Sequence, residues 1–286
     1  MRRASITLAA LALLSATARA QSAEWTEPFP PFRVAGNLYY VGSRGLASYL
    51  VTTPQGHILI NSNLEASVPH IRESVRQLGF EFRDVKVLLI SHAHWDHDAG
   101  SAKVKQLTGA KYMVMREDVD VVESGGKTDF HYGGDPATYR APASVDRVLR
   151  DGDTVSLGGV SLVARRTAGH TKGCTTWTLR LRAGDTNQEA VIICSPNVNP
   201  GYRLVGNAKY PAIARDYQRG FEVLESLRCD VFLGAHGSYY DLEGKYARLK
   251  AGAANAFVDP AGCARFVAEK KKEFQSRLAA ETGARR

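Results

Sequence analysis

The sequence has 286 residues, of which 44% are hydrophobic and 23% charged, and its formal net charge is +8. This ordinary composition excludes a disordered chain, a collagen-like repeat and a multi-span membrane protein. The length allows one large domain or two modest ones.

The first 20 residues have the features of a secretory signal peptide. Arg2 and Arg3 precede a short apolar run at residues 6–14, and residues 18–20 (Ala-Arg-Ala) form a small-x-small cleavage pattern. The apolar run is too short to anchor the chain across a bilayer. We therefore expect cleavage before Gln21, export to the periplasm, no membrane insertion, and a single domain at residues 21–286.

The positive charge is concentrated at the two ends of the chain. Removal of residues 1–20 takes away three arginines and no acidic residue, which leaves +5, and residues 264–286 carry +4 of this. A protein that binds nucleic acid needs a basic stripe over its folded body. We therefore expect no nucleic-acid partner.

The body of the chain alternates between strand and helix patterns. Short β-branched or aromatic runs bounded by Gly, Pro, Asn or Asp predict strands at residues 38–41, 48–52, 57–60, 85–90, 111–115, 154–157, 160–164, 176–181, 190–194 and 231–233. Helical periodicity predicts helices at residues 66–78, 100–107, 213–227, 242–250 and 264–278. Sheets that pack together, with the helices on their outer sides, would bury the apolar faces of these strands and helices.

Residues 124–145 have no clear period and are rich in Gly, Pro and aromatic residues. A loop of this length within a compact domain is usually functional. Its aromatic side chains argue against a disordered insert. We expect Phe130, Tyr132 and Tyr139 to lie in a flap over a substrate.

The strongest chemical signal is the segment Ser-His-Ala-His-Trp-Asp-His at residues 91–97. It directly follows a predicted buried strand, which would deliver these side chains at its carboxyl end. Three imidazoles beside a carboxylate are costly to bury without partners. Metal ligation uses neutral imidazole and ionised carboxylate and removes that cost. The segment therefore predicts that His92, His94, Asp96 and His97 bind metal.

Two more histidines follow predicted strands in the same way. His170 comes after the strand at residues 160–164, and His236 comes after the strand at residues 231–233. Each one alone is a weak signal. Because the carboxyl ends of strands gather at one side of a sheet, we expect both to join the first cluster.

The His-x-His-x-Asp-His segment, the Gly-His-Thr turn at residues 169–171 and the Gly-Ala-His at residues 234–236 resemble the metallo-β-lactamase superfamily. The resemblance implies an α/β fold, the αβ/βα four-layer sandwich, with two mixed β-sheets and helices on the outer faces. It also implies two zinc ions per chain at one edge. His92, His94 and His170 would hold the first ion, and Asp96, His97 and His236 the second.

In this superfamily, the branches differ at one residue on the strand that follows the Gly-His-Thr turn. Hydrolases such as glyoxalase II carry a bridging aspartate there, and class B subclass 1 enzymes carry a cysteine ligand. Here Ser195 takes the position, although a shift of one residue would place Cys194 there. The serine pattern resembles class B subclass 3, as do residues 199–202, 227–231 and 257–260. Members commonly have Asp at the position of Asn61, so the support of the metal ligands is expected to differ here.

Export would place the four cysteines in an oxidising compartment. A bridge between Cys229 and Cys263, also a feature of subclass 3, would contribute roughly 3–4 kcal/mol on the chain-entropy model. Cys174 and Cys194 flank a predicted hairpin with its turn near residues 184–185. They either pair or remain buried thiols, and the sequence leaves both open.

The resemblance implies a secreted β-lactamase that hydrolyses the amide bond of penicillins, cephalosporins and carbapenems through a zinc-bound hydroxide, and so confers antibiotic resistance. Asp96 would orient the hydroxide, and Tyr202 would stabilise the developing oxyanion or serve only in packing. Ser195, Asn199, Tyr202 and Phe130 are the expected substrate contacts. We expect a monomer whose partners are small β-lactams. The alternatives are another hydrolase of this fold (a lactonase or thioesterase) and a non-catalytic zinc-binding protein with closed four-ligand sites.

Overall fold

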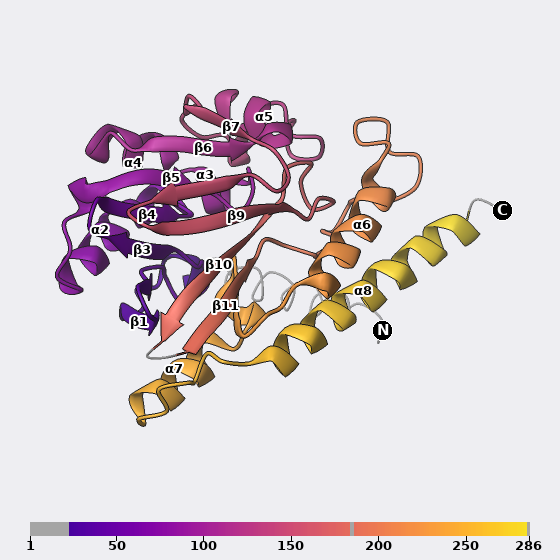
Figure 1. Ribbon diagram of the computed structural model, residues 1–286. Coiled ribbons are helices and arrows are strands. Elements are labelled where there is room, and N and C mark those ends of the chain that lie inside the picture. The colour runs from indigo at the N-terminus through magenta and orange to yellow at the C-terminus, as the bar shows by residue number, and fades with distance from the viewer. Residues whose placement is uncertain (1–22, 184–185, 285–286) are drawn as a thin grey trace, which may run out of the picture.

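The computed structural model describes residues 23–183 and 186–284. The predicted signal peptide at residues 1–20 and the predicted turn at residues 184–185 lie outside these described residues. The described chain contains two β-sheets that pack face to face, with helices on their outer sides (Figure 1).

The first sheet contains seven strands within the described residues, in the order β1-β2-β3-β4-β5-β6-β7. Its members are β1 (Phe32–Ala35), β2 (Leu38–Tyr40), β3 (Tyr49–Thr53), β4 (Gly56–Ile60), β5 (Val85–Leu89), β6 (Lys111–Met115) and β7 (Arg147–Leu149). Pairing is antiparallel from β1 to β4 and parallel from β4 to β7. The sheet is therefore mixed, and β5 and β6 point their carboxyl ends to the same edge.

The second sheet contains five strands within the described residues, in the order β12-β11-β10-β9-β8. They are β8 (Thr154–Leu157), β9 (Val160–Arg166), β10 (Thr175–Ala183), β11 (Thr186–Ile193) and β12 (Val231–Gly234). The β11–β12 pair is parallel and the other pairs are antiparallel. Both sheets are thus mixed, as predicted.

The helices cover the outer faces of the two sheets. The α-helices are α2 (Val68–Gln77), α3 (Trp95–Asp98), α4 (Ser101–Thr108), α5 (Val119–Glu123), α6 (Ile213–Ser226), α7 (Leu242–Lys250) and α8 (Pro260–Gly283), and the short 3-10 turns are η1 (Glu65–Ser67), η2 (Phe82–Asp84), η3 (Arg116–Asp118), η4 (Pro136–Thr138) and η5 (Gly237–Tyr239). One core cluster joins α2 and α4 to the outer face of the first sheet. The other lies between the sheets and extends to α6 and α8, which run side by side in Figure 1.

The structure adds elements that the sequence patterns do not predict. Strands β1 and β7 have only four and three residues, and Pro30 and Pro31 mask the pattern of β1. Helices α3 and α5 are single turns that carry no amphipathic period. Residues 124–145 lack a strand or an α-helix, as expected, and contain only η4. Among the described residues, no helix is both long enough and apolar enough to span a bilayer.

Candidate metal centre

The first group of predicted ligands comes from two strand ends that meet at one edge. His92 and His94 follow β5, and His170 follows β9. Side chains two positions apart on extended chain share a face, so His92 and His94 point the same way. Potential ligand atoms of these three histidines lie within 4.8 Å of one another. The structure therefore assembles the predicted His92–His94–His170 triad.

The turn before His170 depends on a glycine. Gly169 has a φ of +133°, and a Cβ at this position would collide with the ring of Tyr217 on α6. Only glycine accepts both the backbone angle and the close approach. Gly169 thus lets His170 turn from β9 toward the first sheet.

The second group lies directly beside the first. The single turn of α3 brings Asp96 and His97 together, and His236 follows β12. The His97 and His236 Nε2 atoms are 3.1 Å apart, and Asp96 Oδ2 lies 3.2 Å and 3.5 Å from them. These separations are those expected of ligand atoms around one metal ion. All six predicted ligands therefore converge on one edge.

The electrostatics of the centre favour the protonation states that metal ligation requires. Burial lowers the pKa of His170 to about 4 and that of His236 to about 3. Burial also lowers the pKa of His92 and of His94. Burial alone would raise the pKa of Asp96, but the neighbouring His97 and His236 outweigh it and the net shift is downward. At neutral pH His92, His94, His170 and His236 are therefore neutral, and Asp96 is ionised.

Buried nitrogens in the centre lack protein partners. His92 Nε2 is buried and has no hydrogen-bond partner among the described residues; His97 Nδ1 is also unpaired there, but it is the ring nitrogen opposite the one beside Asp96 and His236. An unpaired buried polar atom is costly, and a metal ion removes the cost for a nitrogen aimed at it. The donor set of imidazoles and one carboxylate suits zinc. The residues present therefore fit the implied metal.

Other residues hold the ligands from the side away from the centre. His170 Nδ1 lies 2.9 Å from the carbonyl oxygen of Asn197, and His92 Nδ1 lies 3.1 Å from Ser91 Oγ. Such contacts fix the orientation of a metal-binding imidazole.

Asp118, at the end of η3, joins the two ligand-bearing loops and is absent from the residues predicted from sequence. Its carboxylate accepts hydrogen bonds from Ala93 N at 3.0 Å, Thr171 Oγ1 at 2.8 Å and Gly173 N at 2.7 Å. Burial raises its pKa to about 6. Asp118 follows β6, so the strand-end rule applied to residues 111–115 points to this region.

Arg140 ties the long loop to the same centre and is also absent from the sequence predictions. Its Nε lies 2.7 Å from Asp98 Oδ2 in a buried ion pair, and its Nη2 donates to the carbonyl oxygen of Ala93 at 2.7 Å. The hydroxyl of Tyr112 donates to the same aspartate. The loop at residues 124–145 is therefore anchored to the ligand segment rather than free.

A cleft of about 300 Å³ opens onto the centre. Trp25, Trp95 and Tyr132 form aromatic walls, and Asn197, Asn199 and Tyr239 supply polar groups. The predicted contact residue Asn199 does line this cleft, and its Nδ2 donates to Tyr132 Oη at 3.0 Å. Trp25 comes from a helical turn at residues 23–26, near the start of the described chain.

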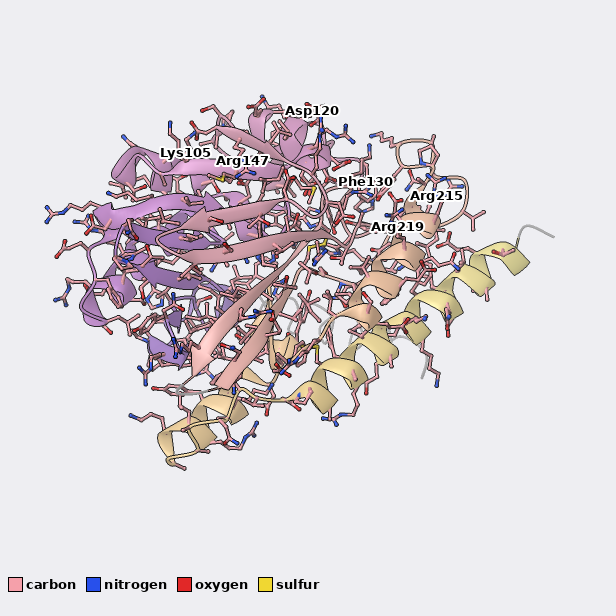
Figure 2. All side chains as sticks on the ribbon, viewed as in Figure 1. Lys105, Asp120, Phe130, Arg147, Arg215 and Arg219 are labelled. Atoms are coloured by element: carbon pink, nitrogen blue, oxygen red, sulfur yellow. A yellow bond between two sulfur atoms is a disulfide. The ribbon has the colours of Figure 1, made fainter. Side chains whose placement is uncertain are left out.

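Three predicted substrate contacts lie behind the cleft wall. Phe130 is buried, and its ring packs against the rings of Tyr202 and Tyr210. Figure 2 shows Phe130 beside the part of α6 that carries Arg215. Tyr132 takes the place at the cleft that the sequence assigned to Phe130. Ser195 Oγ lies 3.0 Å from the hydroxyl of Tyr239, which is itself at the cleft surface.

Tyr202 is also buried, and its hydroxyl already has a partner. The Tyr202 hydroxyl donates to the carbonyl oxygen of His170 at 2.8 Å and lies 3.4 Å from His94 Nε2. These contacts position two ligand residues. Tyr139, another aromatic residue predicted in the flap, is exposed and donates to Gly133 within its own loop.

Asn61, which stands where members of the superfamily commonly have Asp, supports the ligand segment through the backbone of that segment. Its Oδ1 accepts from Ser91 N at 2.7 Å and its Nδ2 donates to the carbonyl oxygen of Ala47 at 3.2 Å. An aspartate could not make the second bond, so the amide suits this site. Asn61 contacts the backbone before His92 and no ligand side chain.

The structure bridges both cysteine pairs, Cys229 with Cys263 and Cys174 with Cys194. The question that the sequence leaves open for Cys174 and Cys194 is thus answered in favour of pairing. Cys194 lies next to His92 and does not join the Asp96–His97–His236 group. The lesser possibility of Cys194 as a ligand in that group is therefore not supported by its position.

Residues 43–236 match the sequence profile of the Metallo-beta-lactamase superfamily, and this range includes all six predicted ligands. The chain belongs to this superfamily. Its curated relatives match over short segments only: a probable metallo-hydrolase of Burkholderia pseudomallei is 34% identical over 93 residues, 32% of this chain. The chain spans about a third of the length of that relative.

Solved metallo-beta-lactamase structures match over nearly the whole chain. The native FEZ-1 metallo-beta-lactamase from Legionella gormanii is 57% identical, with a TM-score of 0.89 over 90% of this chain and 98% of that one. BJP-1, a subclass B3 metallo-beta-lactamase of Bradyrhizobium japonicum, is 35% identical, with a TM-score of 0.85 over 92% and 98%. LRA-12, a class B3 di-zinc metallo-beta-lactamase from an Alaskan soil metagenome, is 34% identical, with a TM-score of 0.85 over 90% and 97%. These matches confirm the predicted fold.

Proposed function

We propose that this protein is a zinc-dependent β-lactamase of class B subclass 3 that opens the amide bond of penicillins, cephalosporins and carbapenems. The observation that carries the proposal is the donor set: an all-histidine triad beside an Asp-His-His triad, with Ser195 where other branches carry a ligand. The similarity to solved subclass B3 enzymes supports it. Antibiotic resistance of the host would follow.

Two zinc ions, when bound, would supply an activated water and a Lewis acid for the lactam carbonyl. The first would be held by His92, His94 and His170. Asp96, His97 and His236 would hold the second. Three protein ligands for each ion leave positions open, which distinguishes this arrangement from a closed structural site.

The side chains around the cleft would bind and orient the β-lactam. Trp25 and Trp95 offer apolar faces to the substituents of the drug. The amide of Asn199 and the hydroxyl of Tyr132 already form one hydrogen bond, and they can exchange it for bonds to the substrate carboxylate. The ionised Asp96 would accept a hydrogen bond from a water molecule at the open side of the Asp96–His97–His236 group, and it would so orient the nucleophile.

A substrate panel distinguishes this proposal from the nearest alternative, a lactonase or thioesterase of the same fold. The zinc-loaded protein is assayed on a penicillin, a cephalosporin, a carbapenem, an N-acyl lactone and an acyl thioester. We expect turnover of the β-lactams to exceed that of the lactone and the thioester by orders of magnitude. Preferential turnover of the lactone or thioester would instead support the alternative.

The number of zinc ions is tested by metal counting on the variant His236→Ala. The wild-type protein is expected to retain two ions per chain after dialysis and the variant one. Two tightly held ions in the variant would contradict the assignment of the second site.

Export to the periplasm and a monomeric state are further parts of the proposal. The Arg-rich start, short apolar run and cleavage pattern of residues 1–20 support export. The mass of the periplasmic protein should then correspond to a chain that begins at Gln21.

A further inference from the structure

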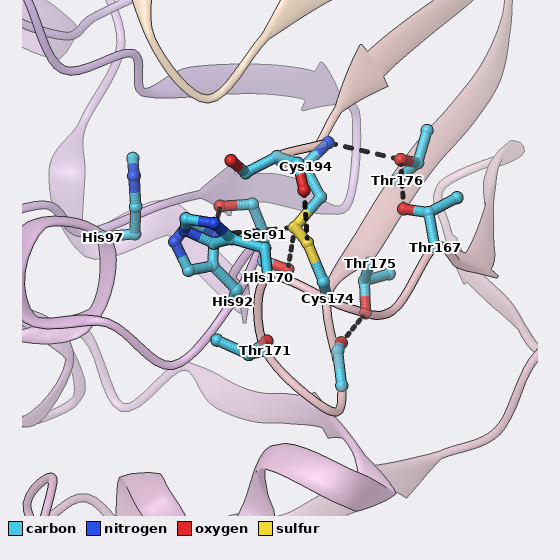
Figure 3. Close-up of a disulfide and its surroundings, with 12 residues drawn as sticks. Ser91, His92, His97, Thr167, His170, Thr171, Cys174, Thr175, Thr176 and Cys194 are labelled. Carbon is cyan, nitrogen blue, oxygen red and sulfur yellow. Dashed lines mark hydrogen bonds between the residues drawn. A yellow bond between two sulfur atoms is a disulfide. The ribbon is translucent and has the colours of Figure 1, made fainter. Parts of the chain in front are cut away.

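A disulfide lies directly behind the first metal triad. Cys174, which precedes β10, is bridged to Cys194, which follows β11, and both are fully buried. The sulfur of Cys194 lies 3.2 Å from the carbonyl oxygen of Ser91 and 3.6 Å from His92 Nδ1 (Figure 3). The bridge therefore touches the ligand segment itself.

His92 presents its two ring nitrogens to different surroundings. Its Nε2 is buried and without a partner among the described residues, whereas its Nδ1 lies 3.1 Å from Ser91 Oγ and 3.6 Å from Cys194 Sγ. One nitrogen is therefore available to the triad, and the other faces sulfur. Ligand atoms of His92, Cys174 and Cys194 all lie within 4.8 Å of one another.

The separation between His92 Nδ1 and Cys194 Sγ matches a soft-metal site, whereas the two sulfurs, bonded to each other in the disulfide, must move apart after reduction to act as two ligands. With metal–sulfur bonds of about 2.3 Å and metal–nitrogen bonds of about 2.0–2.1 Å, tetrahedral geometry puts sulfur and nitrogen about 3.6 Å apart. The Nδ1–Sγ distance of 3.6 Å equals that value. The disulfide prevents binding, because neither sulfur is a thiolate while the S–S bond persists.

We propose that reduction of the Cys174–Cys194 bridge creates a metal site for a thiophilic divalent cation, formed by both sulfurs and His92 Nδ1. A dithiol reductant gives two electrons and two protons to the S–S bond and itself becomes a disulfide. The incoming cation then displaces three protons to solvent: the two thiol protons and, because zinc takes the Nε2 lone pair of His92, the proton on His92 Nδ1. The site uses Nδ1 of His92, whereas the first triad uses Nε2 of the same ring. Metal binding at this site does not depend on whether the protein hydrolyses β-lactams.

The site would stay closed in an oxidising compartment, where the disulfide persists. It would open where a dithiol reductase or a reducing compartment acts on the folded chain. This makes metal binding by the Cys174–Cys194 pair conditional on redox state, whereas binding by the two triads is not.

The test compares cadmium binding before and after reduction of the zinc-loaded protein. A water-soluble phosphine reduces the disulfide under anaerobic conditions. Water supplies the oxygen atom of the phosphine oxide and the two thiol protons. After removal of the phosphine, Cd²⁺ is added, and the ions per chain are counted by native mass spectrometry. The reduced protein is expected to carry one ion more than the oxidised protein and to show an ultraviolet thiolate-to-cadmium charge-transfer band.

Two cysteine variants locate the extra ion. Cys194→Ser and Cys174→Ser each remove one sulfur, and each is expected to weaken the extra binding by at least about tenfold after reduction. Cys229→Ser is the matched control, because it breaks the other bridge far from His92, and it should keep the extra ion.

Three results would overturn the proposal. The first is an equal ion count before and after reduction, and the second is an extra ion that survives in both Cys194→Ser and Cys174→Ser. The third is loss of the folded circular dichroism spectrum when the wild-type protein is reduced, because the site requires a folded dithiol.

Discussion

Asp118 shows how a residue that touches no metal can determine the geometry of a metal site. Its two carboxylate oxygens bind the backbone between His92 and His94 and the turn after His170. The two loops come from different sheets, and this carboxylate helps to fix their separation, together with the Tyr202 hydroxyl and the 2.7 Å hydrogen bond from Thr175 N to the carbonyl oxygen of Ser91. The pKa of Asp118, raised by burial to about 6, reflects the cost of keeping the carboxylate there.

Asp118→Asn tests this positioning role. The amide keeps the volume of the side chain. Its NH2 group, however, would face at least one of the three groups that now donate hydrogen bonds to Asp118, and two donors cannot bond to each other. We expect zinc affinity at the first triad to fall about ten- to a hundredfold. Competition with a chromophoric chelator measures the affinity, and Co²⁺ absorption spectra report the ligand geometry.

Asp146→Asn is the matched control. Asp146 accepts a hydrogen bond from Tyr112 N at 2.8 Å, at the opposite end of β6 from Asp118. If Asp118→Asn and Asp146→Asn reduce zinc affinity equally, Asp118 acts through general stability and not through the loops.

The lowered histidine pKa values predict how stability depends on pH. His236 titrates at about 3 in the folded chain and near 6.5 in the unfolded chain, so the unfolded chain takes up the proton first as the pH falls. Stability is therefore present at neutral pH and is lost as the pH falls below about 6.5. Between pH 7.5 and pH 5, roughly 2 kcal/mol should be lost through this residue.

Urea unfolding of the metal-free protein, compared with His236→Gln, isolates this contribution. Glutamine does not titrate, so the variant should lose roughly 2 kcal/mol less over the same pH interval. Identical pH slopes for the two proteins would show that His236 is not held neutral by burial.

At the scale of elements, Asp259 connects the start of α8 to α7. Its carboxylate accepts a hydrogen bond from Gly262 N at 2.8 Å, and it lies 3.0 Å from Nζ of Lys245, a lysine that is 1% exposed. Lys245 Nζ also lies over the ring of Phe232, at 5.1 Å. A buried ammonium that loses its charged partner is strongly destabilising.

Asp259→Asn and Asp259→Ala separate the two roles. Asparagine still caps the helix but leaves Lys245 unpaired, which should cost about 1–3 kcal/mol in urea unfolding. Alanine should cost about 1 kcal/mol more, because the cap is lost as well. In the Asp259→Asn background, Lys245→Met removes the unpaired ammonium and should recover most of the lost free energy of unfolding. No recovery would mean that the unpaired lysine does not cause the loss.

The strand ends explain why the ligands were predictable and their supports were not. His92, His170 and His236 each follow a clear apolar strand, so a rule that needs only the sequence places them together. The contacts of Asp118 and Arg140 join segments that are distant in sequence, and their partners are mostly backbone atoms. Backbone donors and acceptors carry no residue signature, so no spacing in the sequence reveals such contacts.

At the scale of the whole molecule, the two mixed sheets and most strands follow from local pattern and from the family resemblance. Four short elements escape prediction: β1 follows two prolines, β7 is mostly exposed and so lacks an apolar run, and α3 and α5 are single turns too short to show a helical period. The burial of Phe130 also escapes prediction, because an aromatic residue in an irregular loop looks the same in sequence whether it faces a cleft or the core. Tyr132, two residues further on, faces the cleft instead.

The proposed function requires hydrolysis of a β-lactam by metal held in the two triads. The most direct measurement is the rate of carbapenem hydrolysis by the purified protein as isolated, after complete zinc removal by a chelator, and after zinc is restored. We predict that activity disappears with the zinc, with the fold unchanged by circular dichroism, and returns when zinc is added. Undiminished hydrolysis by protein verified to be free of metal, or no hydrolysis by protein loaded with two zinc ions, would contradict the account.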